Sequence, residues 1–139
     1  MAITSTQVIT DTRYRTAVKW ISDAAANSTV SLLDVSGLMG FQTGGLVNIA
    51  KIYWTSSAPS GGLDIIWDAT TNVPAFICEG ASGTYGYMPG QPAFAQPMPL
   101  AAGSTGDVLI TNASATFTLV IEYHKIEATV GHGNGWAAD

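Results

Sequence analysis

The chain has 139 residues, of which only 11% are charged, and its formal net charge is −5. Five Lys and Arg residues are too few for a phosphate-binding stripe, so nucleic-acid binding is disfavoured. The sequence has no run of about 20 apolar residues to span a membrane, and no basic start with an apolar run as in a signal peptide. We expect one domain, made in a cytoplasm, that stays there or leaves with a larger particle.

Cys78 is the only cysteine, so an internal disulfide is excluded. Apolar residues make up 47% of the chain, which suits a packed core. We therefore expect Cys78 to be a small buried hydrophobe. A nucleophilic cysteine would need a neighbouring base, and His124 and His132 are the two histidines available.

Residues 7–21 alternate with period two and are rich in β-branched and aromatic types. This pattern predicts one long strand, bent near its middle. Its second face carries Arg13, Arg15 and Lys19, and we expect that face to be wet or to touch an acidic partner. A polar turn at 23–28 and a short strand at 29–36 follow.

Residues 46–55 alternate again, but both faces are largely apolar, which predicts a central strand. After a Ser, Pro and Gly-rich turn, the next strand places Leu63, Ile65 and Trp67 toward the core. The intervening residues are predicted to face outward, and these are Asp64, Ile66 and Asp68.

A short strand is predicted at 75–79, and residues 80–99 are predicted to form a long loop with four prolines. Proline cannot donate to a sheet ladder, so this loop should lie outside the central sheet. Long loops in compact domains are often functional. We expect contact with a partner or a neighbouring subunit through the loop's large side chains, Tyr85, Tyr87, Met88, Phe94 and Met98.

Residues 107–112 and 116–125 are predicted to form a hairpin that finishes the sheet, with Phe117, Leu119 and Ile121 facing inward and His124 outward. The periodic pattern ends after Lys125. We therefore divide the chain into a domain at 1–125 and a C-terminal arm at 126–139, with Trp136 as the arm's candidate partner contact.

About eight short strands with regular turn signals, and no helix of normal length, indicate an all-β fold. We predict an antiparallel β-sandwich of jelly-roll-like form. The strand aromatics Trp54, Trp67, Phe117 and Tyr123 are expected to lie in its core.

The sequence offers no catalytic, cofactor-binding or metal-binding residues that we would assign. Asp64 and Asp68 could act as an acid–base pair, as in glycosidases, but on an outward face we expect them to be solubilising. Asp107 is expected to begin a strand. Two histidines without cysteine or carboxylate at ligand spacing do not make a metal site, and the glycine runs lack the strand–loop–helix setting of a phosphate loop.

Four segments carry a family resemblance: LVNIAKIYWT from Leu46, GLDIIWDATTN from Gly62, STGDVLITN from Ser104 and FTLVIEYHK from Phe117. Their order and spacing resemble small virion proteins of tailed bacteriophages, over roughly residues 7–125. The resemblance implies a non-enzymatic capsid decoration (cement) protein, located on the virion, that binds the assembled head and bridges major capsid subunits. We also expect a homo-oligomer, with a trimer as the first expectation.

Two other classes remain open. A tail-fibre, receptor-binding or carbohydrate-binding module would need exposed aromatic rings that form a flat platform, and Tyr85 and Tyr87 are the candidates for it. A small enzyme such as a cupin would need histidines and carboxylates clustered on its strands, a pattern that this sequence lacks.

Overall fold

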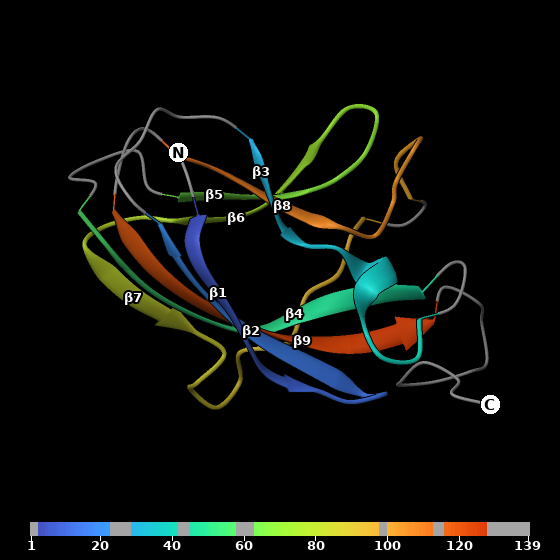
Figure 1. Cartoon of the computed structure of the whole chain (residues 1–139), viewed down its shortest axis with the longest axis horizontal. Helices are drawn as coiled ribbons and strands as arrows, with labels where there is room; N and C mark the ends of the chain where they lie inside the picture. The colour runs from blue at the N-terminus through green and yellow to red at the C-terminus, as the bar shows by residue number, and fades with distance from the viewer. Residues whose placement is uncertain are drawn as a thin grey trace.

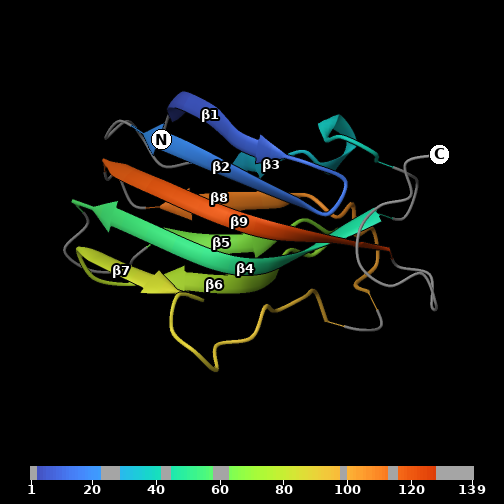
Figure 2. The same ribbon diagram turned by 90° about the horizontal axis from the view of Figure 1, so that it is seen from below.

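Two antiparallel sheets face each other in the computed structural model (Figures 1 and 2). The structure describes residues 3–22, 29–41, 45–57, 63–97, 100–112 and 116–127. The five-stranded sheet has the order β1 (Ile3–Asp11), β2 (Arg15–Ser22), β9 (Phe117–Glu127), β4 (Gly45–Ser56), β7 (Ser82–Tyr85). The four-stranded sheet has the order β3 (Val30–Leu33), β8 (Val108–Asn112), β5 (Leu63–Trp67), β6 (Val73–Cys78). The predicted antiparallel β-sandwich is confirmed.

The strand pairs are nested as in a jelly roll. β5 pairs with β6, β4 with β7, β3 with β8, and β2 with β9, as if one long hairpin had been rolled up. The rolling also places β4 beside β9 and β5 beside β8. Eight strands in this order form the jelly-roll arrangement, and β1 is an additional edge strand beside β2.

The core lies between the two sheets, where the alternation predicted it. All six residues that were expected to face inward are at most 3% exposed: Leu63, Ile65, Trp67, Phe117, Leu119 and Ile121. Trp54 and Tyr123 are buried as well, and Tyr123 meets Trp20 edge-on with ring centroids 6.5 Å apart. A short 3-10 helix, η1 (Val35–Gly37), follows β3. No helix within the described ranges has the length and hydropathy needed to cross a membrane.

The prediction of one bent strand at residues 7–21 was wrong, because β1 and β2 form an antiparallel hairpin there. The turn between them contains neither Gly nor Pro. Instead the Thr12 hydroxyl accepts hydrogen bonds from the backbone N–H groups of Tyr14 and Arg15, and the Thr12 N–H donates to the Arg15 carbonyl at 2.8 Å. A Thr side chain can therefore stabilise a tight turn even where the alternating sequence pattern continues without a break.

The prediction of a hairpin between residues 107–112 and 116–125 was also wrong. β8 lies in the four-stranded sheet and β9 in the five-stranded sheet, so the connection between them crosses from one layer to the other. Alternation reports which side of a strand is buried, but it does not identify the neighbouring strand.

Residues 80–99 are not entirely a loop, since β7 forms within them and pairs with β4. Farther along, Phe94 makes a two-hydrogen-bond bridge with Ile49, at 2.8 and 3.0 Å. β9 also continues two residues past the predicted domain boundary, where Ile126 and Glu127 pair with Leu46 and Gly45. The remainder of the predicted arm, with Trp136, lies outside the described residues.

Asp107 immediately precedes β8, consistent with the predicted turn or strand-start position, and it ties this strand to η1. Its Oδ1 accepts a hydrogen bond from the N–H of the buried Val35 at 2.9 Å. Burial raises the pKa of Asp107, the hydrogen bond from Val35 lowers it, and the neighbouring carboxylates of Asp34 and Asp68 raise it again, with a net upward shift.

We expect Asp107→Ala to lower the free energy of unfolding by about 1–3 kcal/mol, because the Val35 N–H loses its acceptor in a buried position. Asp107→Asn keeps an acceptor oxygen and should lose less. The raised pKa of Asp107 also predicts a pH dependence. This carboxyl contributes stability below its unfolded-state pKa, and the contribution is lost as pH rises through the folded-state pKa. The Asn variant should not show this pH-dependent loss of stability. Urea melts of all three proteins at pH 3 to 7 test both points, and equal losses for Ala and Asn would contradict the first.

Candidate functional site

The loop residues predicted to touch a partner divide into two groups, and Tyr85 and Phe94 form the first. Both are half-buried and belong to an aromatic cluster with Phe76. The Tyr85 centroid is 5.6 Å from that of Phe76 and 5.5 Å from that of Phe94. The Tyr85 hydroxyl donates to the Pro92 carbonyl at 2.7 Å. These two rings therefore hold the loop against the sandwich, and most of their contacts are internal.

Tyr87 and Met88 form the second group and point outward, with 53% and 66% of their surface exposed. Gly86 produces the change of direction. Its φ is +88°, and a Cβ there would lie 2.0 Å from the Ala50 carbonyl oxygen, so the turn requires glycine. The Gln91 side chain fixes the turn by accepting from the Gly86 N–H at 2.8 Å. Met98, the fifth loop residue of the prediction, lies outside the described residues.

The outer face of the five-stranded sheet is charged, and part of its charge is paired. Glu122 on β9 accepts from Arg15 on β2 at 3.0 Å and lies 3.8 Å from the Lys51 ammonium on β4. The Lys51 ammonium also lies 5.3 Å from the centroid of the Tyr87 ring. Burial, and after it the Glu122 charge, raises the pKa of Tyr87. Glu122 therefore offsets only part of the positive charge of this face, and Tyr87 packs at its edge against Lys51.

Tyr85 and Tyr87 do not share a face. Tyr85 packs toward Phe76 of the opposite sheet, whereas Tyr87 lies over Lys51 on the outer face. A flat two-ring platform, as a carbohydrate-binding module would need, is therefore not formed by this pair.

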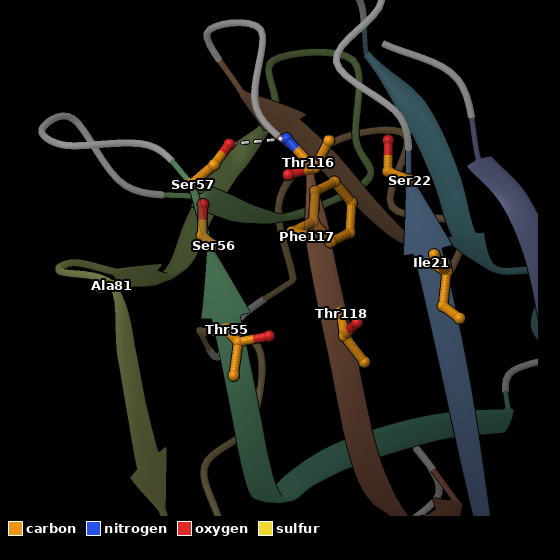
Figure 3. A pocket seen from close by; sticks show the side chains of 9 residues that line it. All are labelled: Ile21, Ser22, Thr55, Ser56, Ser57, Ala81, Thr116, Phe117 and Thr118. Atoms are coloured by element: carbon orange, nitrogen blue, oxygen red, sulfur yellow. Dashed lines mark hydrogen bonds between the residues drawn. The ribbon is translucent and has the colours of Figure 1, made fainter.

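A depression of about 400 Å³ opens at one end of the five-stranded sheet (Figure 3). Most of its lining is hydroxyl-bearing, and the set is Ile21, Ser22, Thr55, Ser56, Ser57, Ala81, Thr116, Phe117 and Thr118. The Thr116 N–H donates to the Ser57 hydroxyl at 3.0 Å. Among the described residues that line it, none is an acid or base in the physiological range. Their hydroxyl groups can form hydrogen bonds with a bound group.

The titratable candidates from the sequence are held in structural roles. Cys78 is fully buried, and burial, with the nearby Asp64 charge, raises its pKa to about 12, so the thiol stays protonated. Asp68 accepts from the Thr105 hydroxyl at 2.7 Å. His124 is exposed on β9, as predicted. Within the ranges that the structure describes, His, Cys, Asp and Glu form no group of three or more suited to a metal ion.

The sequence reasoning missed a buried lysine. Lys125 is 0% exposed, and its ammonium donates to the Asp11 carboxylate and to the Met39 carbonyl, the latter at 2.8 Å. Lys125 ends the last predicted strand, and no local pattern marks the Asp11 carboxylate that meets it from β1. Near this lysine, Tyr14 and Met39 are each more than half exposed.

Exposed apolar residues at two places on the surface were also not predicted from the sequence. One lies on β1 and the loops beside it, and comprises Val8, Ile9, Tyr14 and Met39. The other lies on the outer face of the four-stranded sheet, where Ile77 is 51% exposed. Both can take part in protein contacts, and neither contains a reactive group.

Comparisons with known proteins give this chain no relative: no protein-family model matches it, and neither a curated protein nor a solved structure does. The fold and the surfaces described above are therefore the structural basis for a functional proposal.

Proposed function

We propose that this chain is a non-enzymatic decoration protein of a tailed-phage capsid, which binds the assembled head and bridges neighbouring major capsid subunits. The observation that carries the proposal is the place of the four segments that resemble small virion proteins. They contain β4, β5, β8 and β9, and these strands pair as β4 with β9 and β5 with β8 at the centre of the jelly roll. The resemblance thus rests on the strands that define the fold.

The fold class agrees with this role by analogy. Jelly rolls occur in viral capsid domains, but also in lectins and cupins. Fold alone does not determine function, so the surface has to discriminate among these classes. A lectin-like platform made from Tyr85 and Tyr87 is disfavoured by their opposite directions. A cupin would need a cluster of histidines and carboxylates, and the described strands supply no such cluster.

The exposed apolar side chains favour protein contact. Val8, Ile9, Tyr14, Met39, Tyr87 and Met88 each expose more than half of their surface. Three of them, Val8, Ile9 and Tyr14, lie on β1 or in the turn after it, and large exposed apolar groups mark interaction sites when they are contiguous. A chain with 11% charged residues also has few charges to desolvate on docking.

The physical effect of such a protein follows from linkage. A ligand that binds only the assembled shell stabilises it by about 2.7 kcal/mol per site when the free ligand is at 100 times its Kd. Hundreds of modest contacts on a fixed lattice then resist disassembly together. A protein that bridges two subunits also makes its second contact at high effective concentration.

Co-sedimentation with undecorated capsids of the phage that encodes the chain tests the proposal. We expect the full-length protein to pellet with assembled shells and to saturate, and to leave unassembled capsid subunits unbound. Shells that carry the protein should also withstand higher temperature or denaturant. Failure of the full-length chain to bind shells refutes the decoration role.

Co-sedimentation with undecorated capsids also tests whether the C-terminal arm, residues 126–139, contributes to shell binding. Because β9 runs to Glu127, a chain that ends there keeps every described strand and should fold. It lacks Trp136, and aromatic anchors often contribute about 2 kcal/mol or more, so we expect shell binding roughly 30-fold weaker. Equal occupancy by both chains removes the arm from the mechanism. Sedimentation equilibrium of the free protein tests the expected trimer.

A further inference from the structure

We infer that the outer face of the four-stranded sheet is the surface that docks on the shell, and that the shell surface it fits is apolar at its centre and basic at its rim. This inference rests on the proposed function and adds to it the docking face and the chemistry of the partner. The apolar part of this face, called here the apolar row, consists of Pro74, Ile66 and Leu109, with Ile77 beside it.

The strand register makes these residues neighbours. Ile66 on β5 lies opposite Pro74 on β6 and opposite Leu109 on β8, so the three form one row across three strands. Ile77 lies in the adjacent row, opposite Asp64. The residues on either side of Ile66 along β5, Ile65 and Trp67, are buried in the core, so Ile66 points away from it.

This composition is unusual for a solvated sheet. An antiparallel sheet with one wet face normally alternates apolar inside and polar outside. Here one outward row across three adjacent strands is apolar (Pro74, Ile66 and Leu109), while the next row carries Asp64 and Thr111 beside Ile77. A hollow of about 120 Å³ lies among them, lined by Asp64, Ile65, Ile66, Pro74 and Ile77. A hollow of this kind can take an apolar side chain of a partner, as interface hot spots do.

The basic and the acidic residues lie on different sheets, and this separation determines the charge that the partner surface should carry. All five basic residues of the chain lie on the five-stranded sheet or its first turn: Arg13, Arg15, Lys19, Lys51 and Lys125. The strands of the four-stranded sheet and the residues that directly flank them carry five carboxylates and no Lys or Arg, and these are Asp34, Asp64, Asp68, Glu79 and Asp107. Of these, Asp64 lies on the outer face beside Ile77, so electrostatic complementarity favours a basic partner surface.

A second copy of the chain is the other source of a basic surface, and geometry argues against it. The five-stranded sheet is the opposite layer of the sandwich (Figure 2), and its outer face, called here the basic face, carries Arg15, Lys19 and Lys51. A contact between opposite faces is heterologous and does not close into a ring, so it would build open stacks. The basic face also neutralises part of its charge internally, through Glu122 with Arg15 and Lys51. The shell is therefore the occupant we assign.

The test compares two matched surface variants in the shell-binding assay. Ile77→Asn changes the proposed docking face at a residue that is 51% exposed. Tyr53→Asn is the control, because Tyr53 is 40% exposed on the outer face of the other sheet. We expect Ile77→Asn to weaken shell binding by about 10-fold or more, which corresponds to about 1.4 kcal/mol, and Tyr53→Asn to change it by less than about 3-fold.

Salt dependence supplies the electrostatic test. Wild-type binding should weaken as salt rises, and Asp64→Lys should bind more weakly and respond less to salt.

If wild type binds shells and Ile77→Asn binds equally well, the docking face is wrong while the decoration role stands. Loss of binding by Tyr53→Asn alone would assign docking to the opposite face. If Ile77→Asn instead dissociates an oligomer of the free protein in sedimentation velocity, the occupant is a second copy and the inference is overturned. Failure of wild type to bind refutes the proposed function itself.

Discussion

Trp67→Ala is expected to lower the free energy of unfolding by about 3–5 kcal/mol, the usual cost of truncating a large buried aromatic side chain. Trp67 is 2% exposed and ends β5, where it lies opposite Val73 on β6 and Val108 on β8. Its removal leaves a cavity between two sheets whose strands are fixed by backbone hydrogen bonds, so the site can collapse only in part. Single domains are typically stable by about 5–15 kcal/mol, so this one change removes a large fraction of the total.

Urea denaturation followed by tryptophan fluorescence and by far-ultraviolet circular dichroism measures the effect. Tyr53→Ala is the control, because Tyr53 lies on an outer face with 40% of its surface exposed. It should lose no more than about 1 kcal/mol, the size of a cross-strand side-chain contribution. A loss below about 1 kcal/mol for Trp67→Ala would mean that the assigned face of β5 is wrong.

The inward faces of β5 and β9 could be predicted because alternation records burial directly. Alternate side chains of a strand point to the same face, so the apolar residues at every second position of β5, Leu63, Ile65 and Trp67, all face the core. Strand neighbours could not be predicted in this way. β8 and β9 are consecutive and joined by a short connection, yet they belong to different sheets, because pairing depends on contacts that are distant in sequence.

The positions of surface side chains were likewise predictable only where they depend on local sequence. Tyr87 and Met88 could be predicted as exposed because they follow a local turn at Gly86. The half-burial of Tyr85 depends on Phe76, which comes from the other sheet, and no local pattern reports that contact. Ile66 was expected to face outward, but its neighbours Pro74 and Leu109 become visible only once the register of three strands is known.

Lys125→Met is expected to lower the free energy of unfolding by about 3 kcal/mol, the lower end of the cost of breaking a buried ion pair. Lys125 is 0% exposed, whereas the Asp11 side chain is 23% exposed, so water can reach the carboxylate in part after the change. Methionine keeps most of the apolar stem but gives no donor to Asp11 or to the Met39 carbonyl. The Met39 N–H would still donate to Asp11, at 2.9 Å.

This lysine matters because it joins three separate segments. Its ammonium connects β9 to the end of β1 and to the loop after η1, and its backbone N–H donates to the Tyr14 carbonyl at 2.7 Å. The first strand and the η1 loop are thereby fixed to the last strand of the sandwich. We therefore expect the variant to lose hydrogen-exchange protection in β1 beyond the global loss of stability.

A double-mutant cycle separates the ion pair from simple loss of packing. If Lys125 and Asp11 are coupled, Asp11→Asn should cost little more when Lys125 is already methionine, since the uncompensated carboxylate is then neutralised. Lys19→Met is the matched control on the outer face of β2, and its free energy of unfolding should change by no more than about 0.5 kcal/mol. Strict additivity of the two single variants would mean that the pair makes no net contribution, and that the cost of Lys125→Met comes from lost packing and from the lost hydrogen bond to the Met39 carbonyl.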